Sequence, residues 1–156
     1  MAIFGLGSNW NSDEMKEKFF KNNNFEIGWE YDQAIDLYDA VSLLKTGDIV
    51  YLKANQVGSR TIRVKGIGIV YSSYIQSIFE NKTTNSADFF VMVKWIVKNE
   101  FEIIIPEAQG KLTNVRAATF YEEYLPLVQK EIIEKLFSSL VSATTNPAGA
   151  PCVNCK

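Results

Sequence analysis

Residues 48–54 and 61–71 are the two runs that most constrain the fold of this chain. Both are rich in the β-branched and aromatic residues that favour strands. A loop containing Gly58 joins them, so we expect an antiparallel hairpin. Successive side chains of a strand point to opposite faces, so the first run should place Ile49, Tyr51 and Lys53 on one face of the strand. Val50 and Leu52 should lie on the other face.

The second run changes the parity of its apolar positions near Lys65 and Gly66. Apolar side chains stand at Ile62 before the change and at Ile67 after it, an odd spacing for a regular strand. One extra residue in a strand shifts parity in this way, so we predict a β-bulge at Lys65–Gly66.

The other predicted elements complete an α+β pattern. Strands are expected at residues 2–6, 25–29, 89–98 and 102–105. Helices are expected from a cap at Asn11 or Ser12, from a cap at Asp32, and over 119–140, with a capping box at Thr119 and Glu122 and a kink at Pro126. We predict one domain over residues 1–141, a twisted or closed β-barrel of five to six strands with flanking helices and a C-terminal helix, and a disordered tail over 142–156.

Composition excludes several function classes. The 156 residues suffice for one core, and the net charge of −2 argues against a protein that coats nucleic acid by bulk electrostatics. The absence of histidine removes the commonest general base and the commonest metal ligand. We therefore expect no enzyme activity, no cofactor and no metal. No membrane span or signal peptide is recognised, so we expect a cytoplasmic protein.

The two cysteines, Cys152 and Cys155, stand in the predicted tail. Such a pair can be half of a zinc site or a redox dithiol. The sequence offers no further cysteine or histidine ligand, so two exposed thiols in a disordered tail are the simpler interpretation.

The three tryptophans have different predicted environments. Trp95 alternates with Val93 and Val97 and is predicted to be core. Trp29 ends a predicted strand, and its ring either packs in the core or faces a loop-lined mouth. Trp10 stands in a polar loop, where so large a ring must cover or bind something.

Charged residues also have two interpretations. The basic residues of the hairpin could hold phosphates or form an ordinary solvated strand face. Asp48 is predicted to stabilise a turn, because a short carboxylate bonds to nearby turn amides. The acidic pairs at 13–14 and 122–123 are explained as helix starts. The basic residues concerned are Lys53, Arg60, Arg63 and Lys65, with Lys111 and Arg116 as further members.

The order of short motifs resembles the EVE and YTH families of PUA-like β-barrels. The segment 4–8 (Phe-Gly-Leu-Gly-Ser) is similar to their opening strand and loop, and 27–29 (Ile-Gly-Trp) to their Gly-Val-Trp element. Segments 47–51, 66–70 and 94–96 resemble a Gly-Asp strand, a Gly-Phe-Ala strand and a Trp-Ile strand. The likeness covers residues 2–105.

This resemblance implies an aromatic cage for a modified base, typically a methylated adenine or cytosine flipped from a strand. The resemblance makes Trp29 a cage wall and places Ser8 and Asn9 beside the base edge, and we hypothesise that Trp10 or Tyr31 provides the second ring. The predicted partners are a modified nucleobase, a nucleotide or single-stranded nucleic acid. The candidate ligand-binding residues are Ser8, Asn9, Trp10, Trp29, Tyr31, Tyr51, Lys53, Arg63 and Arg116.

Two other functions are weighed against this one. A protein–protein adaptor or homodimer would dock through the C-terminal helix, with a face made of Phe120, Tyr121, Tyr124, Leu127 and Val128. An enzyme using carboxylate or lysine chemistry has no supporting constellation.

Overall fold

The computed structural model describes residues 1–56, 58–76, 90–109 and 118–145. Its main sheet has the strand order β4-β7-β6-β5-β1-β9, and β8 also pairs with β6. All pairs are antiparallel except β1 with β5. The strands of this sheet are β1 (Ile3–Gly7), β4 (Asn24–Phe25), β5 (Ile49–Ala54), β6 (Thr61–Ser72), β7 (Val91–Val97), β8 (Phe101–Ile104) and β9 (Phe120–Glu122).

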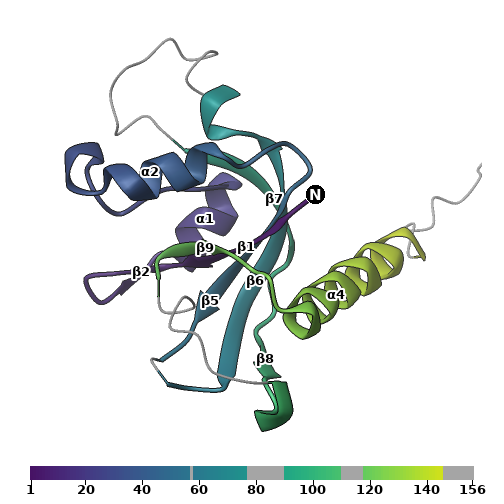
Figure 1. Cartoon of the computed structure of the whole chain (residues 1–156). Coiled ribbons are helices and arrows are strands. Elements are labelled where there is room, and N and C mark those ends of the chain that lie inside the picture. Colours follow the sequence, from purple (N-terminus) through teal and green to yellow (C-terminus); the bar gives the residue numbers. More distant parts are fainter. Residues whose placement is uncertain (57, 77–89, 110–117, 146–156) are drawn as a thin grey trace, which may run out of the picture.

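The remaining elements cover the two faces of this sheet (Figure 1). On one face lie the helices α1 (Lys16–Asn22) and α2 (Ile35–Ser42), and on the other lies α4 (Pro126–Thr145). Short elements complete the chain: a hairpin of β2 (Asn9–Trp10) and β3 (Asp13–Glu14), and the 3₁₀ turns η1 (Tyr31–Gln33) and η3 (Glu107–Gln109).

The sheet curls into a half-barrel and does not close among the described strands. Its edge strands β4 and β9 are linked through side chains, since the rings of Phe25 and Phe120 lie 6.4 Å apart. The ring of Phe4 also stacks on that of Phe120, with centroids 5.1 Å apart. The two edge strands therefore meet through aromatic side chains and not through backbone pairing among the described strands.

Two core clusters follow from the alternation of the strands. Val50 and Leu52 belong to the cluster under α1 and α2, whereas Ile49 and Tyr51 belong to the cluster under α4. The two faces predicted for β5 are thus confirmed at these positions. Trp95 is also confirmed as core, because it is buried and its indole N–H donates to the Asn24 carbonyl at 3.2 Å.

The predicted bulge is present. Leu52 pairs with Gly66 and Lys53 pairs with Val64, so Lys65 is the extra residue of β6. Asp48 behaves as the predicted turn residue, since its buried carboxylate accepts the backbone N–H of Ala2 at 2.7 Å and of Lys45 at 2.9 Å.

The first helix begins later than predicted. Asn11 and Ser12 do not cap it; they have φ of 45° and 89° and form the two-residue turn of the β2–β3 hairpin. Positive φ at both central positions is the feature of the type I′ turn that two-residue hairpins favour, and asparagine tolerates that region well. α1 therefore starts at Lys16.

The segment around Trp29 is also different from the prediction. β4 ends at Phe25, because its pairing with β7 covers only Asn24 and Phe25. Trp29 consequently lies in a loop and not at a strand end, and Asp32 lies inside η1 instead of capping α2.

The C-terminal helix starts at Pro126, so the predicted kink is wrong. Proline is favoured in a first helical turn because its missing N–H has no partner there. The residues assigned to the start of that helix, with the capping box at Thr119 and Glu122, instead lead into and form β9. α4 continues to Thr145, beyond the domain boundary predicted at residue 141.

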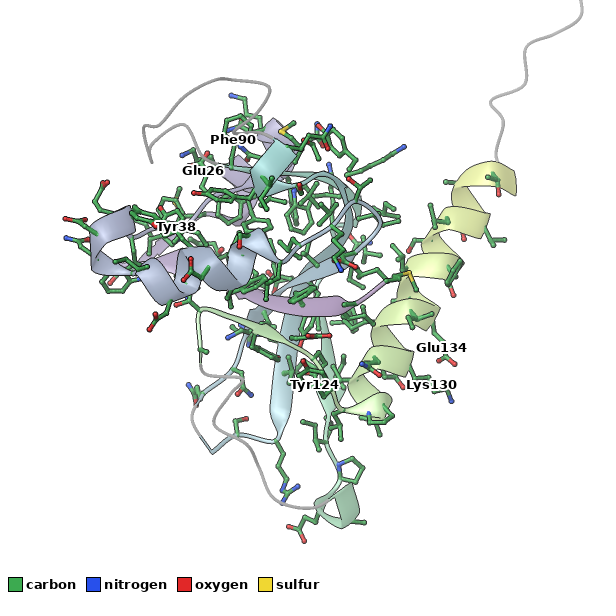
Figure 2. The ribbon with its side chains drawn as sticks, turned by 45° about the horizontal axis from the view of Figure 1, so that its top comes forward. Glu26, Tyr38, Phe90, Tyr124, Lys130 and Glu134 are labelled. Carbon is green, nitrogen blue, oxygen red and sulfur yellow. The ribbon has the colours of Figure 1, made fainter. Side chains whose placement is uncertain are left out.

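The docking face predicted for an adaptor is not formed as proposed. Phe120, Tyr121 and Val128 are buried in the two cores. The outer side of α4 carries Lys130 and Glu134, which lie away from the sheet (Figure 2).

In the part of the chain that the structure describes, no helix has the length and hydropathy needed to span a membrane.

Candidate functional site

Two pockets meet where β1 ends. A smaller one of about 210 Å³, which we call the aromatic pocket, is lined by Asn9, Trp10, Asn11, Gly28, Trp29, Gln33 and Thr119. A larger one of about 580 Å³, which we call the polar cleft, is lined by Gly7, Ser8, Asn9, Lys53, Ala54, Asn55, Gln56, Ser59, Thr61, Arg63, Glu102, Ala118 and Thr119. Asn9 and Thr119 line both, so the two pockets adjoin.

The two indoles of the aromatic pocket are held differently. Trp10 packs edge-on against the buried ring of Phe19, with centroids 5.9 Å apart, and the Lys18 ammonium lies 5.7 Å from its ring centre. Trp29 is 53% exposed, but its carbonyl accepts a hydrogen bond from the Tyr38 hydroxyl at 2.7 Å. The pocket thus combines one packed ring with one exposed ring on an anchored backbone.

Gly28 permits this arrangement because Trp10 lies directly against it. A Cβ at Gly28 would stand 2.7 Å from the Trp10 ring, closer than real Cβ contacts allow. The absence of a side chain at Gly28 therefore has a packing reason in this structure.

Ser8 and Asn9 are positioned by the bulge residue Lys65. Its buried ammonium donates to Ser8 Oγ at 3.3 Å and Asn9 Oδ1 at 3.2 Å, and it pairs with the Glu14 carboxylate. Partial burial alone would raise the pKa of the Glu14 carboxyl, but hydrogen bonds from Lys65, Ser8 and the Lys16 backbone lower it overall. This network joins the β2–β3 hairpin to β6. Ser8 is itself fully buried, and it belongs to the wall of the polar cleft and not to that of the aromatic pocket.

Two of the described candidate residues, Tyr31 and Tyr51, line neither the aromatic pocket nor the polar cleft. Tyr31 packs against Tyr38, with ring centroids 5.3 Å apart. Tyr51 is fully buried under α4, because the alternation of β5 turns it into that core. Arg116, like Lys111, lies outside the described residues.

The polar cleft contains Lys53 and Arg63 from the paired strands β5 and β6. Arg63 is exposed, whereas Lys53 is 6% exposed and donates to the Ala118 carbonyl at 2.6 Å. The Lys53 ammonium also lies 5.4 Å from the centre of the Tyr121 ring. Burial, and secondarily the charge of Lys65, lower the pKa of Lys53 to about 8.

We expect the lowered pKa of Lys53 to make the protein more stable as pH rises from 8 to 10. Over this range the unfolded chain, with a lysine pKa near 10.5, binds more protons than the native protein, so the free energy of unfolding should increase by about 2 kcal/mol. Urea unfolding at pH 7, 8, 9 and 10 measures this change, and Lys53→Met should flatten it. Lys130→Met on the exposed side of α4 is the control. Parallel pH profiles for the native protein and Lys53→Met would contradict the assignment.

Several residues that line the pockets are not among the candidate ligand-binding residues predicted from the sequence, among them Asn11, Gly28, Gln33, Asn55 and Thr119. The sequence predicts a helix cap at Asn11 and a capping box at Thr119. In the structure Asn11 lies in a hairpin turn and Thr119 precedes β9, so neither residue caps a helix. Gln33 had no distinguishing local signal, because its place in the pocket depends on η1 following the Trp29 loop.

Comparison with known proteins does not assign this chain to a family. No protein-family model matches this chain, and no curated protein matches it.

Proposed function

We propose that this protein is a non-enzymatic binding module that holds the flat ring of a modified nucleobase or small nucleotide in the aromatic pocket. A PUA-like relationship to the EVE and YTH families is part of the proposal. The curled mixed sheet and the position of Trp29 beside a loop-lined pocket support it.

The observation that carries this proposal is the exposure of Trp29 next to a packed Trp10. Trp29 is 53% exposed, so its ring face is accessible, and a planar heterocycle gains ~1–3 kcal/mol by stacking on an aromatic face. Because both indoles line one small pocket, a ring that enters it would contact at least one indole face or edge.

Amide side chains provide the means to recognise the edge of such a ring. Asn9, Asn11 and Gln33 all line the aromatic pocket, and each amide carries both a donor and an acceptor. Nucleobase edges present the same mixture of groups, so an amide-lined pocket is suited to them.

Indole fluorescence provides the test. We expect methylated adenosines and cytidines, titrated into the protein, to quench tryptophan emission along a saturable curve, and unlabelled ligands to compete with one another. Ribose and cyclohexanol serve as controls for the sugar and for apolar contact without a flat heterocycle. Quenching that rises linearly with concentration and never saturates would reject the proposal.

A further inference from the structure

The amides that line the aromatic pocket are not equally able to turn. Asn9, Asn11 and Gln33 contribute the amides of its described wall. An amide oxygen accepts hydrogen bonds and an amide NH2 group donates them, so a partner at one end decides which end is left for a ligand. Asn9 and Gln33 each have such a partner inside the protein.

Lys65 sets the orientation of Asn9. The Lys65 ammonium donates to Asn9 Oδ1 at 3.2 Å. Its other two hydrogen bonds go to Ser8 and Glu14, so all of its N–H donors are used. An ammonium accepts no hydrogen bond, and because Lys65 is buried, turning the amide round would leave a buried donor without an acceptor. The NH2 end of Asn9 therefore remains for a ligand.

The capping box of η1 sets the orientation of Gln33 in the same way. The backbone N–H of Glu30 donates to Gln33 Oε1 at 3.4 Å, and the Glu30 side chain accepts the backbone N–H of Gln33. A backbone N–H only donates, so it also requires the oxygen end of the amide. Among the described residues, neither the NH2 group of Gln33 nor that of Asn9 has a hydrogen-bond partner.

The other polar groups of the wall do not oppose these two donors. The indoles of Trp10 and Trp29 each have an N–H that only donates. The amide of Asn11, at the exposed turn of its hairpin, and the Thr119 hydroxyl can turn to present a donor or an acceptor. None of these lining residues is charged. The pocket therefore offers two oriented amide donors to an uncharged ring.

Bases differ in the number of adjacent acceptors that one edge offers. A 6-oxopurine presents two acceptors side by side, O6 and N7, whereas a 6-aminopurine presents N7 beside an amino donor. On the corresponding edge cytosine presents an amino donor, and a uracil-type ring presents O4 as its one acceptor. Two amide donors are thus fully matched by the 6-oxopurine edge, because an amino group would place donor against donor and leave both unpaired.

We infer that the aromatic pocket is selective for a 6-oxopurine, whose O6 and N7 accept hydrogen bonds from the NH2 groups of Asn9 and Gln33. This inference rests on the proposed function, since the ring must stack in the same pocket. It names a different base from the methylated adenine or cytosine that the sequence resemblance implies. An amino base would still stack on an indole, but it would bind more weakly.

Three closely matched nucleosides test this selectivity. Inosine, adenosine and 7-deazainosine are titrated calorimetrically into the whole protein at pH 7. Adenosine has an amino group in place of the oxo group of inosine, and 7-deazainosine has a C–H group in place of N7. Inosine should bind about tenfold more tightly than either, because each change sets an amide donor against a group that accepts nothing. Equal affinity of inosine and either of the other two would overturn the inference.

Acidic variants exchange each donor for an acceptor and keep the internal contact. In Gln33→Glu the new carboxylate can still accept the Glu30 N–H, and an oxygen stands where the NH2 group stood. Asn9→Asp makes the same exchange and can still accept from Lys65. Each variant should lower the ratio of inosine to adenosine affinity to about one or below, since the adenosine amino group gains an acceptor. Both nucleosides are uncharged, so the added charge acts on them alike.

Gln56→Glu is the matched control. Gln56 is exposed and lines the polar cleft but not the aromatic pocket, so this variant receives the same change of charge beside the site. Its affinity ratio should stay at the native value. Melting temperatures identify the folded variants, and one folded acidic variant suffices for the test. If every folded acidic variant keeps the full preference for inosine, the amides do not select the base and the inference is wrong.

The outcomes separate this inference from the proposed function. Saturable binding of a methylated adenosine or cytidine, with no preference for inosine over adenosine, overturns the selectivity and leaves the proposed function standing. If no nucleoside binds, the proposed function fails, and the inference fails with it.

Discussion

Trp29→Ala is expected to weaken binding of a heterocyclic ring by roughly 5- to 150-fold, which corresponds to the loss of one stacking face at ~1–3 kcal/mol. The melting temperature should change by about 2 °C or less, because half of the side chain is already exposed and surface substitutions have small effects. Calorimetric titration and thermal unfolding followed by circular dichroism measure the two quantities.

Phe137→Ala is the matched control for this variant. Phe137 is 55% exposed, close to the 53% of Trp29, but it lies on α4. It should cost as little stability and leave ring binding intact. Unfolding of Trp29→Ala well below the native temperature would instead show that the indole is structural, and intact binding in a stable Trp29→Ala would show that the ligand does not stack there.

Glu123→Ala is expected to lower the free energy of unfolding by about 3 kcal/mol, or about 6–12 °C in melting temperature. Glu123 is 1% exposed, and its carboxylate accepts hydrogen bonds from the hydroxyls of Tyr51 at 2.9 Å and Tyr121 at 3.2 Å. It also accepts the backbone N–H of Leu125 at 2.9 Å. Alanine would leave these donors without their charged acceptor and open a cavity. Urea unfolding at pH 7 measures the loss.

The neighbouring residue provides the control. Glu122 lies beside Glu123 in the sequence, but its carboxylate accepts a hydrogen bond from the exposed Tyr124 hydroxyl at 2.6 Å. Glu122→Ala should therefore cost less than about 1 kcal/mol, because its partner remains in water. Equal losses in the two variants would refute a structural role specific to Glu123. Glu123→Gln, which keeps the shape and an acceptor, should recover part of the stability.

The buried network around Glu123 connects three elements. Tyr51 comes from β5 and Tyr121 from β9, and the Leu125 N–H lies just before α4. Burial, and then the neighbouring Tyr121 and Glu123, raise the pKa of the Tyr51 hydroxyl well above its usual value, so it remains a donor at neutral pH. Gly5 leaves room for this packing, since a Cβ there would lie 2.7 Å from the Tyr121 ring.

The sequence predicted most reliably the features that depend on strand period. The two faces of β5, the bulge at Lys65 and the burial of Trp95 all follow from alternation along a single strand. That signal is local, because successive side chains point to opposite faces whatever the partner strand is. The turn contact of Asp48 was equally local, since it bonds to the Lys45 amide three residues away, whereas its bond to the Ala2 amide joins distant parts of the chain.

Short elements were predicted poorly for a related reason. The β2–β3 hairpin and β9 contain too few residues for a period to be visible. Their local signals, an acidic pair and a Thr-x-x-Glu pattern, are also typical of helix starts. Pairing with distant strands outweighed these preferences at β9, where Gly5 and Tyr121 are partners.

The candidate site also contains features that local sequence signals predict and features that depend on long-range contacts. Trp10 could be selected from the sequence because a large ring in a polar loop is unusual, and Trp29 because it ends a predicted strand and resembles a family element. Nothing local distinguished an exposed Trp29 from a buried Tyr51. Lys65 was grouped with Lys53 and Arg63 as a basic residue, whereas its ammonium is committed to Glu14 and to the loop behind the site.

The sequence by itself determined the strand faces, the bulge and the absence of histidine chemistry, because these depend on residue type and on a period of two. Only the tertiary structure decided that the loop after β1, the Trp29 loop and Thr119 meet around two adjoining pockets. It also decided that Glu123 is buried while Glu122 is not. These outcomes depend on strand order and on contacts between residues far apart in the chain, which no local pattern encodes.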